Sequence, residues 1–366
     1  MSKHVRKEIN QLPAYQPIPN PSAVAKELGL STVAKLDTNE TPYGPLFGVH
    51  AAITAAAHRV HEYPDLASTA LTSALADHYD IDPEGIAVGN GSAGLIEAVI
   101  KGVASPGAEV IYSWRSFEAY PLITTIAGAV PRPVPRAPDH RHDLDAILAA
   151  INIHTRIILL CNPSNPTGTY LPPRQIVEFL DQIPRNVLVV LDEAYFEFIT
   201  PRPSVNTLTM AALRRNVIAL RSFSKAWGLA GLRTGWLYTN PALARAIRKC
   251  IVPFSVNTLA QAAAAAALTQ EAAMNRRATR IAADRDRIVA LLRKQTPEIP
   301  TSQGNFFWVP LRAGSASFAE AAKHKGIIVR SFSDEGVRIT IGTTVQNDQL
   351  IAGYPQMLES MKDCAC

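Results

Sequence analysis

Short runs of aliphatic and β-branched residues recur along the first two thirds of the chain, separated by stretches with helical spacing. Five of these runs, each bounded by turn-forming residues, predict strands at 86–88, 109–112, 156–160, 187–191 and 217–220. Strands that are apolar almost throughout are buried on both faces, which is typical of a parallel sheet covered by helices. The pattern therefore predicts an α/β domain whose mixed, mainly parallel sheet is flanked by helices.

The pattern of apolar positions changes after Pro253. An alanine- and arginine-rich stretch at 259–295 predicts one long helix, and short apolar runs then predict strands at 306–309, 327–330 and 337–341. This succession is typical of an α+β unit. The first 45 residues are rich in proline and predict an irregular arm.

The length of the chain agrees with this division, because 366 residues exceed what one compact core usually holds. Hydrophobic residues make up 47% and charged residues 18%, which provides a buried core and excludes a disordered chain. We expect an arm at 1–45 that contributes to the small domain, a large domain at 46–252 and a small domain at 253–366.

The formal net charge is +5, but no dense run of lysine and arginine marks a nucleic-acid surface. No apolar run approaches the roughly 20 residues needed to span a bilayer, and the first ten residues are polar. Four cysteines in a chain of this length do not form a disulfide framework. We therefore expect a cytoplasmic protein that binds neither nucleic acid nor membrane.

A glycine-rich turn, Gly89-Asn-Gly-Ser-Ala-Gly94, joins the first predicted strand to a helix. It has the form G-x-G-x-x-G, but the acid that a dinucleotide site needs about 20 residues later is Glu109, which begins its strand instead of ending it. Small residues at a helix N-terminus expose backbone N–H groups that bind anions. The turn indicates a phosphate site, and a plain tight turn remains the alternative.

Polar residues follow two further strands, at the edge where parallel sheets bind ligands. The loop Asn162-Pro-Ser-Asn-Pro-Thr-Gly168 contains two Asn-Pro steps and presents the Asn165 amide, unless it is only a connecting turn. Asp192-Glu-Ala-Tyr195 places an acid directly after an apolar strand. A buried carboxylate is costly unless a cation meets it, so Asp192 either holds a cation or caps the next helix.

After the strand at 217–220 comes Ser222-Phe-Ser-Lys225, with Arg233 following. The stretch matches S-x-x-K of serine acyl-enzymes, but the companion motifs S-D-N and K-T-G are missing. A lysine at a strand end can instead form a Schiff base. A free lysine has a pKa of about 10.4, whereas a useful amine needs about 7–8. Arg233 and a bound cationic cofactor would lower the pKa of Lys225, although a surface lysine is the simpler alternative.

The order of these motifs resembles that of fold-type-I pyridoxal phosphate (PLP) enzymes, over about residues 12–351. Within that group the chain is similar to the histidinol-phosphate aminotransferase family, and most like its aromatic amino acid (phenylalanine-type) branch. The resemblance implies PLP as cofactor, with Lys225 as its covalent attachment and acid/base and Asp192 paired with the ring nitrogen. It further implies cofactor contacts from Tyr195, Asn165, the stacking Phe117, Ser92, Ala93, Ser222, Ser224 and Arg233. Tyr63 matches a tyrosine that reaches the phosphate from a neighbouring subunit, which implies a homodimer with shared sites.

The resemblance also implies a substrate side to the site. Arg338 stands where the family keeps the arginine that binds the substrate carboxylate, and Arg330 is a second candidate that could bind a side-chain phosphate instead. Asn39 and Tyr15 on the arm match substrate-side positions. Phe254 stands where histidinol-phosphate enzymes carry a tyrosine that helps to hold the substrate phosphate, and Ala93 replaces a further polar residue.

These differences predict an aromatic amino acid: 2-oxoglutarate aminotransferase with ping-pong kinetics, and histidinol-phosphate aminotransferase is the alternative. A PLP lyase or decarboxylase and a degenerate PLP-binding module are more remote alternatives. A dehydrogenase would instead bind nicotinamide. The pair His58-Arg-Val-His61 lacks a third ligand nearby, so we expect an exposed helix face and no metal.

Overall fold

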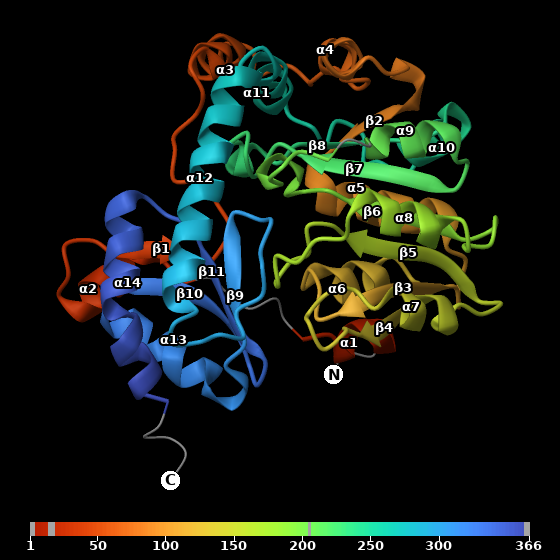
Figure 1. Cartoon of the computed structure of the whole chain (residues 1–366). Helices are drawn as coiled ribbons and strands as arrows, with labels where there is room; N and C mark the ends of the chain where they lie inside the picture. The colour runs from red at the N-terminus through yellow and green to blue at the C-terminus, as the bar shows by residue number, and fades with distance from the viewer. Residues whose placement is uncertain (1–3, 14–18, 204–205, 362–366) are drawn as a thin grey trace.

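The computed structural model describes residues 4–13, 19–203 and 206–361. Its larger sheet has seven strands in the order β2-β8-β7-β6-β5-β3-β4 (Figure 1). Only β8 runs antiparallel to its neighbours. The strands are β2 (Ile86–Gly89), β3 (Glu109–Trp114), β4 (Val130–Pro135), β5 (Thr155–Cys161), β6 (Leu188–Asp192), β7 (Val217–Ser222) and β8 (Gly235–Tyr238). The five predicted strands and the mainly parallel sheet are confirmed.

Two strands of this sheet escaped the sequence pattern. In β4, three of six residues are proline, which breaks the usual signal of a strand, and β4 lies at the edge of the sheet, where missing N–H donors are tolerated. The other, β8, has only four residues and follows a glycine-rich loop. Its antiparallel direction could not be predicted from its composition.

Helices cover both faces of the large sheet because its strands are apolar on both sides. In β5, Ile157 and Leu159 pack against one helical layer, while Ile158 and Leu160 pack against the other. This alternation follows from the two-residue period of a strand. One layer consists of α5 (Gly91–Val103), α6 (Ala119–Ile126) and α10 (Pro241–Arg248), and the other of α7 (Leu144–Ala150), α8 (Pro173–Leu180) and α9 (Thr207–Leu213).

A second sheet has four strands in the order β1-β10-β11-β9. Its strands are β1 (Ala34–Leu36), β9 (Phe306–Val309), β10 (Ile327–Phe332) and β11 (Gly336–Thr340). Strand β1 pairs parallel with β10, so a segment of the N-terminal arm completes a sheet otherwise built near the C-terminus. The helices α13 (Ser315–His324) and α14 (Thr344–Glu359) lie beside this sheet (Figure 1).

The arm is more regular than its prolines predict, and the expectation of an irregular segment is wrong for part of it. It contains α1 (Lys7–Gln11), α2 (Pro21–Leu28) and β1. In α2, Asn20 caps the N-terminus by accepting from the Ser22 and Ala23 N–H groups, and Gly29 ends the helix at a φ of 67°. Proline at the first helical position and glycine just past the end are start and stop signals of a helix.

The single helix expected at 259–295 is also wrong. The structure has α11 (Thr258–Leu268) and α12 (Glu271–Leu292), separated by Thr269 and Gln270. The alanine-rich α11 packs against α3 (Val49–Ala57) and α4 (Thr69–Tyr79), whereas α12 contacts β9 and α14 (Figure 1). The break lets the chain change direction between two packing surfaces. The domain boundaries at 45 and 252 stay predictions.

Short 3-10 helices occupy several connections: η1 (Pro83–Gly85), η2 (Phe196–Phe198), η3 (Ala230–Leu232) and η4 (Arg312–Gly314). Within the described residues, no helix has both the length and the apolar character needed to cross a membrane. No group of three or more His, Cys, Asp or Glu side chains in the same residues is arranged to hold a metal ion.

Candidate active site

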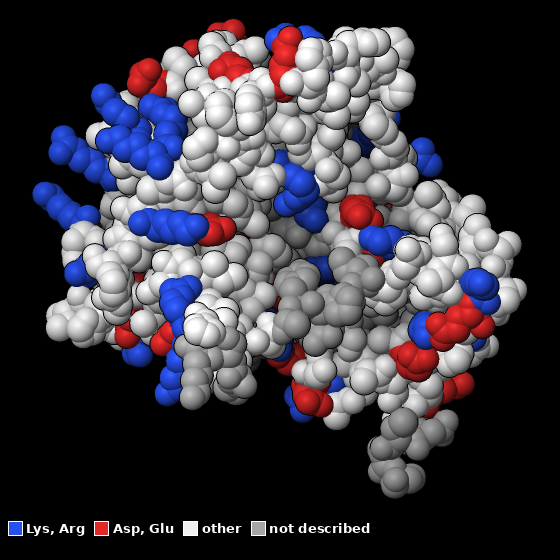
Figure 2. Space-filling view, turned by 180° about the vertical axis from the view of Figure 1, so that it is seen from behind, with Lys and Arg blue, Asp and Glu red and all other residues white. Residues whose placement is uncertain are grey.

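One cavity of about 580 Å³ gathers most of the site residues that the sequence predicts. It lies at the carboxyl ends of β5, β6 and β7 and is bordered by residues of β10 and β11. The predicted residues on its wall are Asn39, Ser92, Ala93, Phe117, Asn165, Asp192, Tyr195, Ser222, Ser224, Lys225, Arg233, Arg330 and Arg338. The face of the molecule in Figure 2 is hollowed near its centre, where basic side chains border the depression.

The N-terminus of α5 forms one end of the cavity. Asn90 precedes the helix without a side-chain capping bond, and the first turn contains no acidic residue. Gly91 has a φ of 73°, and a Cβ on it would stand 2.7 Å from Nη2 of Arg233. The guanidinium of Arg233 therefore lies directly against the start of the helix. Backbone N–H groups, a helix dipole and a guanidinium together make an anion site.

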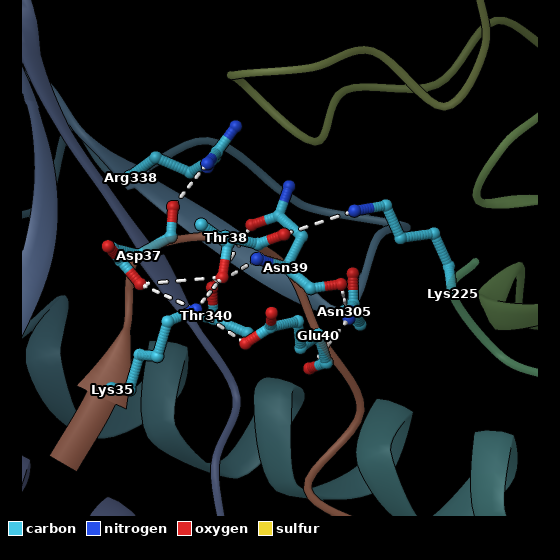
Figure 3. A network of polar contacts seen from close by, with 9 residues as sticks. All are labelled: Lys35, Asp37, Thr38, Asn39, Glu40, Lys225, Asn305, Arg338 and Thr340. Atoms are coloured by element: carbon cyan, nitrogen blue, oxygen red, sulfur yellow. Dashed lines mark hydrogen bonds and ion pairs between the residues drawn. The ribbon is translucent and has the colours of Figure 1, made fainter. Parts of the chain in front are cut away.

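Lys225 presents its amine to the cavity. The Nζ atom donates a hydrogen bond of 3.0 Å to the carbonyl oxygen of Thr38 (Figure 3). Burial, together with the charges of Arg338, Arg233 and Lys35, lowers the pKa of Lys225 to about 7, against the opposing charge of Glu40. The amine therefore carries a substantial neutral fraction at pH 7, as a nucleophile requires.

Asp192 ends β6 and is only 3% exposed. Its Oδ2 accepts a hydrogen bond of 2.7 Å from the Tyr120 hydroxyl, and its Oδ1 accepts one of 3.2 Å from the Ala194 N–H. Burial raises the pKa of Asp192 to about 6, although these two donors and the charge of Lys225 act in the opposite direction. A buried carboxylate that is ionised near neutral pH is suited to pair with a cation.

Tyr195 and Asn39 connect the two sheets at the wall of the cavity. The Asn39 side-chain amide donates to the Tyr195 hydroxyl at 2.9 Å, although the two residues are 156 positions apart. Asn39 is 1% exposed, and its Oδ1 accepts from the Thr340 hydroxyl at 3.1 Å (Figure 3). This network fixes the position of the phenol before any ligand binds.

Arg338 lies on β11 and is 7% exposed. Its Nη1 donates to Oδ1 of Asn165 at 2.6 Å, and its Nη2 donates to the carbonyl oxygen of Asp37. These acceptors hold the planar guanidinium at the cavity wall, where it can bind a carboxylate through two parallel hydrogen bonds.

Phe117 and Arg330 complete the wall of the cavity. The Phe117 ring meets that of Tyr120 edge to face, with centroids 5.5 Å apart. Arg330 forms a bidentate ion pair with Glu118, at 3.1 Å from Nε to Oε2 and 3.0 Å from Nη2 to Oε1. At the phosphate end, the Ser224 hydroxyl accepts from Arg233 at 3.3 Å and Ser222 Oγ accepts from the Ser224 N–H at 3.0 Å.

Two predicted residues, Tyr63 and Phe254, are not brought into this cavity. Tyr63 is 82% exposed and Phe254 is 43% exposed, and their rings pack on each other with centroids 4.8 Å apart. Phe254 lines a different depression, together with residues of α4 and α10. Tyr15 lies outside the described residues.

The cavity also contains residues to which the sequence analysis assigned no role: Asp37, Thr38, Glu40, Glu118 and Cys161. Tyr120, the donor to Asp192, was missed as well. Asp37, Thr38 and Glu40 flank Asn39 in the sequence. Their position next to a predicted site residue could therefore have identified them as candidates. Glu118 and Tyr120 follow Phe117 at the start of α6, where a helix N-terminus could have drawn attention to them.

Comparisons with known proteins agree with this geometry. Residues 31–353 match the family Aminotransferase class I and II. Over 353 residues the chain is 44% identical to an aromatic amino acid aminotransferase of Rhodococcus jostii (strain RHA1), which covers 96% of this chain and 95% of the relative. A protein of the same name from Thermobifida fusca (strain YX) is 43% identical over 348 residues, 95% of each chain.

A solved structure is similar over almost the whole chain. The histidinol-phosphate aminotransferase from Sinorhizobium meliloti, in complex with pyridoxal-5'-phosphate, superposes with a TM-score of 0.89 at 30% identity and covers 99% of both chains. The seven-stranded sheet and the lysine-bearing cavity at its carboxyl edge define an enzyme of PLP fold type I. The chain belongs to the aminotransferase class I and II family and is a PLP-dependent aminotransferase.

The residues of the cavity fit PLP in charge and in chemistry. The uncapped start of α5 and Arg233 suit a phosphate, and no side chain larger than that of glycine can stand at position 91 without moving the guanidinium. Asp192 suits a protonated ring nitrogen, and the amine of Lys225, with its lowered pKa, suits a covalent link to an aldehyde. The family assignment favours this chemistry over the dinucleotide and serine acyl-enzyme alternatives.

Proposed function

We propose that the chain transfers the amino group of aromatic L-amino acids (phenylalanine, tyrosine and tryptophan) to 2-oxoglutarate by a ping-pong mechanism. The observation that carries this proposal is the meeting, in one cavity, of Lys225 with a lowered pKa, the buried Asp192 and the guanidinium of Arg338. Two relatives more than 40% identical over about 95% of the chain are named aromatic amino acid aminotransferases, which supports the donor class.

Bound PLP supplies an electron sink that stabilises negative charge at the substrate α-carbon. Nζ of Lys225 would take the proton from the substrate α-carbon and would then give it back on the cofactor side of the transferred nitrogen. Asp192 would hold a proton on the ring nitrogen, Tyr195 and Asn165 would hydrogen-bond the ring's phenolic oxygen, and Phe117 would pack against the ring. The α5 N-terminus at Ser92 and Ala93 would hold the phosphate together with Ser222, Ser224 and Arg233.

The substrate carboxylate binds Arg338, and such a charge-assisted pair contributes about 1.5–3 kcal/mol. Asn39 helps to shape the substrate side through its bond to Tyr195. Histidinol-phosphate aminotransferase is the second candidate, since a solved structure of that name is 30% identical over 99% of the chain. Phe254 and Ala93 favour the aromatic donors, because each lacks a polar group that would hold a phosphate.

A homodimer would give Tyr63 and Phe254 a role in this reaction. Both rings are exposed, pack on each other and lie outside the cavity of their own chain. We therefore propose that they reach the cavity of a second copy, as the sequence resemblance implies for Tyr63. A cytoplasmic location stays a prediction from the sequence.

A comparison of amino-acid substrates as amino donors tests the proposed specificity. With 2-oxoglutarate as the only acceptor, we expect kcat/KM for phenylalanine and tyrosine to exceed that for histidinol phosphate by about tenfold or more, because one lost hydrogen bond to a charged group is worth at least that factor. Glutamate formation is the readout. A preference for histidinol phosphate would reverse the order of the two candidates, and product release without any acceptor would indicate a lyase.

The pKa of Lys225 predicts how the apoenzyme takes up PLP. Only the neutral amine attacks the cofactor aldehyde, so the rate of covalent attachment should rise with pH and level off above a midpoint near pH 7. Stopped-flow absorbance between about pH 5.5 and 9 measures this rate.

An Arg338→Gln variant provides the matched control for that midpoint. Because the Arg338 charge lowers the pKa of Lys225, its removal should move the midpoint to higher pH. A rate that keeps rising tenfold per pH unit to pH 9 in the unaltered enzyme would show that the amine is not tuned by the cavity.

A further inference from the structure

The segment 37–40, which follows β1, contacts two of the cationic side chains in the cavity. The carbonyl oxygen of Asp37 accepts from Nη2 of Arg338, and the next carbonyl oxygen, that of Thr38, accepts from Nζ of Lys225 at 3.0 Å (Figure 3). Arg338 belongs to β11 in the small sheet, whereas Lys225 follows β7 in the large sheet. Two consecutive carbonyl oxygens thus hold side chains from different sheets.

The backbone of this segment has an unusual conformation at Asn39, whose φ of 55° is left-handed. Residues other than glycine rarely adopt this conformation, and it persists only where surrounding contacts maintain it. The Asn39 N–H donates to the Thr340 hydroxyl at 3.0 Å, and its carbonyl oxygen accepts from the Asn305 side-chain amide at 3.0 Å. The segment is therefore held in one shape, which sets the positions of its carbonyl oxygens.

Lys35 lies across the segment from Lys225 (Figure 3). Its Nζ is 2.5 Å from Oε2 of Glu40 and 3.3 Å from Oδ1 of Asp37, and it also donates to the hydroxyl of Thr38. An ammonium group has three donors, and these three acceptors all belong to the segment. The Lys35 side chain is 25% exposed and does not line the cavity. It therefore acts on the site through the segment.

We propose that Lys35 is a positioning residue, which holds the segment 37–40 and thereby sets where the amine of Lys225 and the guanidinium of Arg338 lie. The amine needs a defined place whenever Lys225 is not linked to the cofactor, and the Thr38 carbonyl provides it. The guanidinium needs one because each amino acid donor, and 2-oxoglutarate in turn, brings a carboxylate to it. The inference rests on the roles proposed for Lys225 and Arg338.

Lys35 also affects the charge of the amine that it helps to position. The charged side chains around Lys225 come from several elements: Arg338, Arg233, Asp192, Glu40 and Lys35. Besides burial, the positive charges among them lower the pKa of Lys225, and Glu40 raises it. Removing the charge of Lys35 should therefore raise this pKa, whereas removing that of Glu40 should lower it. A variant that lacks both charges loses the contacts of Lys35 with little change in net charge.

The test measures ligand binding and proton transfer in Lys35→Met. Calorimetry on the PLP-bound enzyme should show about three- to tenfold weaker binding of 3-phenylpropionate, because a displaced guanidinium keeps only part of a charge-assisted pairing worth at least tenfold. KM for phenylalanine and for 2-oxoglutarate should rise together. Single-turnover rates should fall by about 10- to 100-fold, since a displacement of about 1 Å at a reacting group can cost that much. Lys35→Arg, which keeps the charge and the donors, should restore binding and rate.

The double variant Lys35→Met/Glu40→Gln separates position from charge. The midpoint of PLP attachment to the apoenzyme should move to higher pH in Lys35→Met, to lower pH in Glu40→Gln, and back toward pH 7 in the double variant. The losses in ligand affinity and in rate should persist in the double variant, because the contacts of Lys35 with the segment are still missing.

Lys323 provides a matched control. It pairs with Glu27 at 2.8 Å between α13 and α2, its side chain is 27% exposed, and neither residue lines the cavity. Lys323→Met should therefore leave affinity, rate and midpoint unchanged. Unchanged affinity in Lys35→Met, equal losses in Lys323→Met or full recovery in the double variant would each overturn the proposal. If Arg338→Gln binds 3-phenylpropionate as the unaltered enzyme does, the role of Arg338 fails, while the single-turnover rates still test the hold on Lys225.

Discussion

Lys225→Ala is expected to lose transaminase activity by roughly 10⁴-fold or more, because the same amine forms the covalent link to the cofactor and moves the proton. The variant should also lose the visible absorption band of lysine-bound PLP. Steady-state rates with phenylalanine and 2-oxoglutarate measure the first effect, and absorbance spectra of the purified protein measure the second.

The fold of Lys225→Ala should remain intact. Removing a buried amine whose pKa is depressed also removes the cost of burying its charge, so the melting temperature of the apoprotein should not fall. A small primary amine added to the solution should restore part of the activity by entering the vacated space. Lys101→Ala, which removes an exposed lysine paired with Glu97, is the matched control and should behave like the unaltered enzyme. Retained turnover and absorption in Lys225→Ala would rule out the assigned role.

Asp192→Asn is expected to lower kcat by roughly 10²- to 10⁴-fold. Breaking a buried ion pair typically costs about 3–5 kcal/mol, and each 1.36 kcal/mol is a factor of ten in rate. The amide has the same shape as the carboxylate; its oxygen can accept from the Ala194 N–H, and its NH2 group can donate to the Tyr120 hydroxyl oxygen, so the loss reports chiefly the missing charge. Single-turnover rates with phenylalanine separate this effect from changes in substrate binding.

Tyr120→Phe is the graded control for this prediction. It keeps the carboxylate but removes a hydrogen bond that lowers the pKa of Asp192. The pKa of Asp192 should therefore rise above about 6, and activity should begin to fall at a higher pH on the acid side. A rate loss in Asp192→Asn no larger than in Tyr120→Phe would show that the charge is not required.

The strands of the large sheet were predictable because their apolar runs reflect burial on both faces. The same signal failed for β4, because its prolines interrupt the apolar run and are tolerated only at the edge of a sheet. The sequence pattern also did not predict the break between α11 and α12. An alanine- and arginine-rich sequence favours a helix throughout that stretch. What interrupts the helix is the presence of two separate surfaces, α3 and α4 on one side and β9 with α14 on the other.

The candidate site likewise has one part that the sequence predicts and one part that only the structure reveals. Asn165, Asp192 and Lys225 each follow an apolar strand, and parallel strands bring their carboxyl ends to one edge, so local pattern and one topological rule placed them together. The bond from Asn39 to Tyr195 and that from Lys225 to the Thr38 carbonyl span more than 150 residues. Neither hydrogen bond can be predicted from the spacing of residues along a short segment of the sequence.

The sequence by itself determined the class of sheet and predicted the ligand-binding edge and the residues that bear the chemistry, because these depend on burial patterns and motif order within short segments. Only the tertiary structure decided the electrostatics of the site. The lowered pKa of Lys225 and the ion pair of Glu118 with Arg330 arise from groups that converge from both sheets. Charge interactions depend on distance and burial in space, and those are set only once the two sheets are packed together.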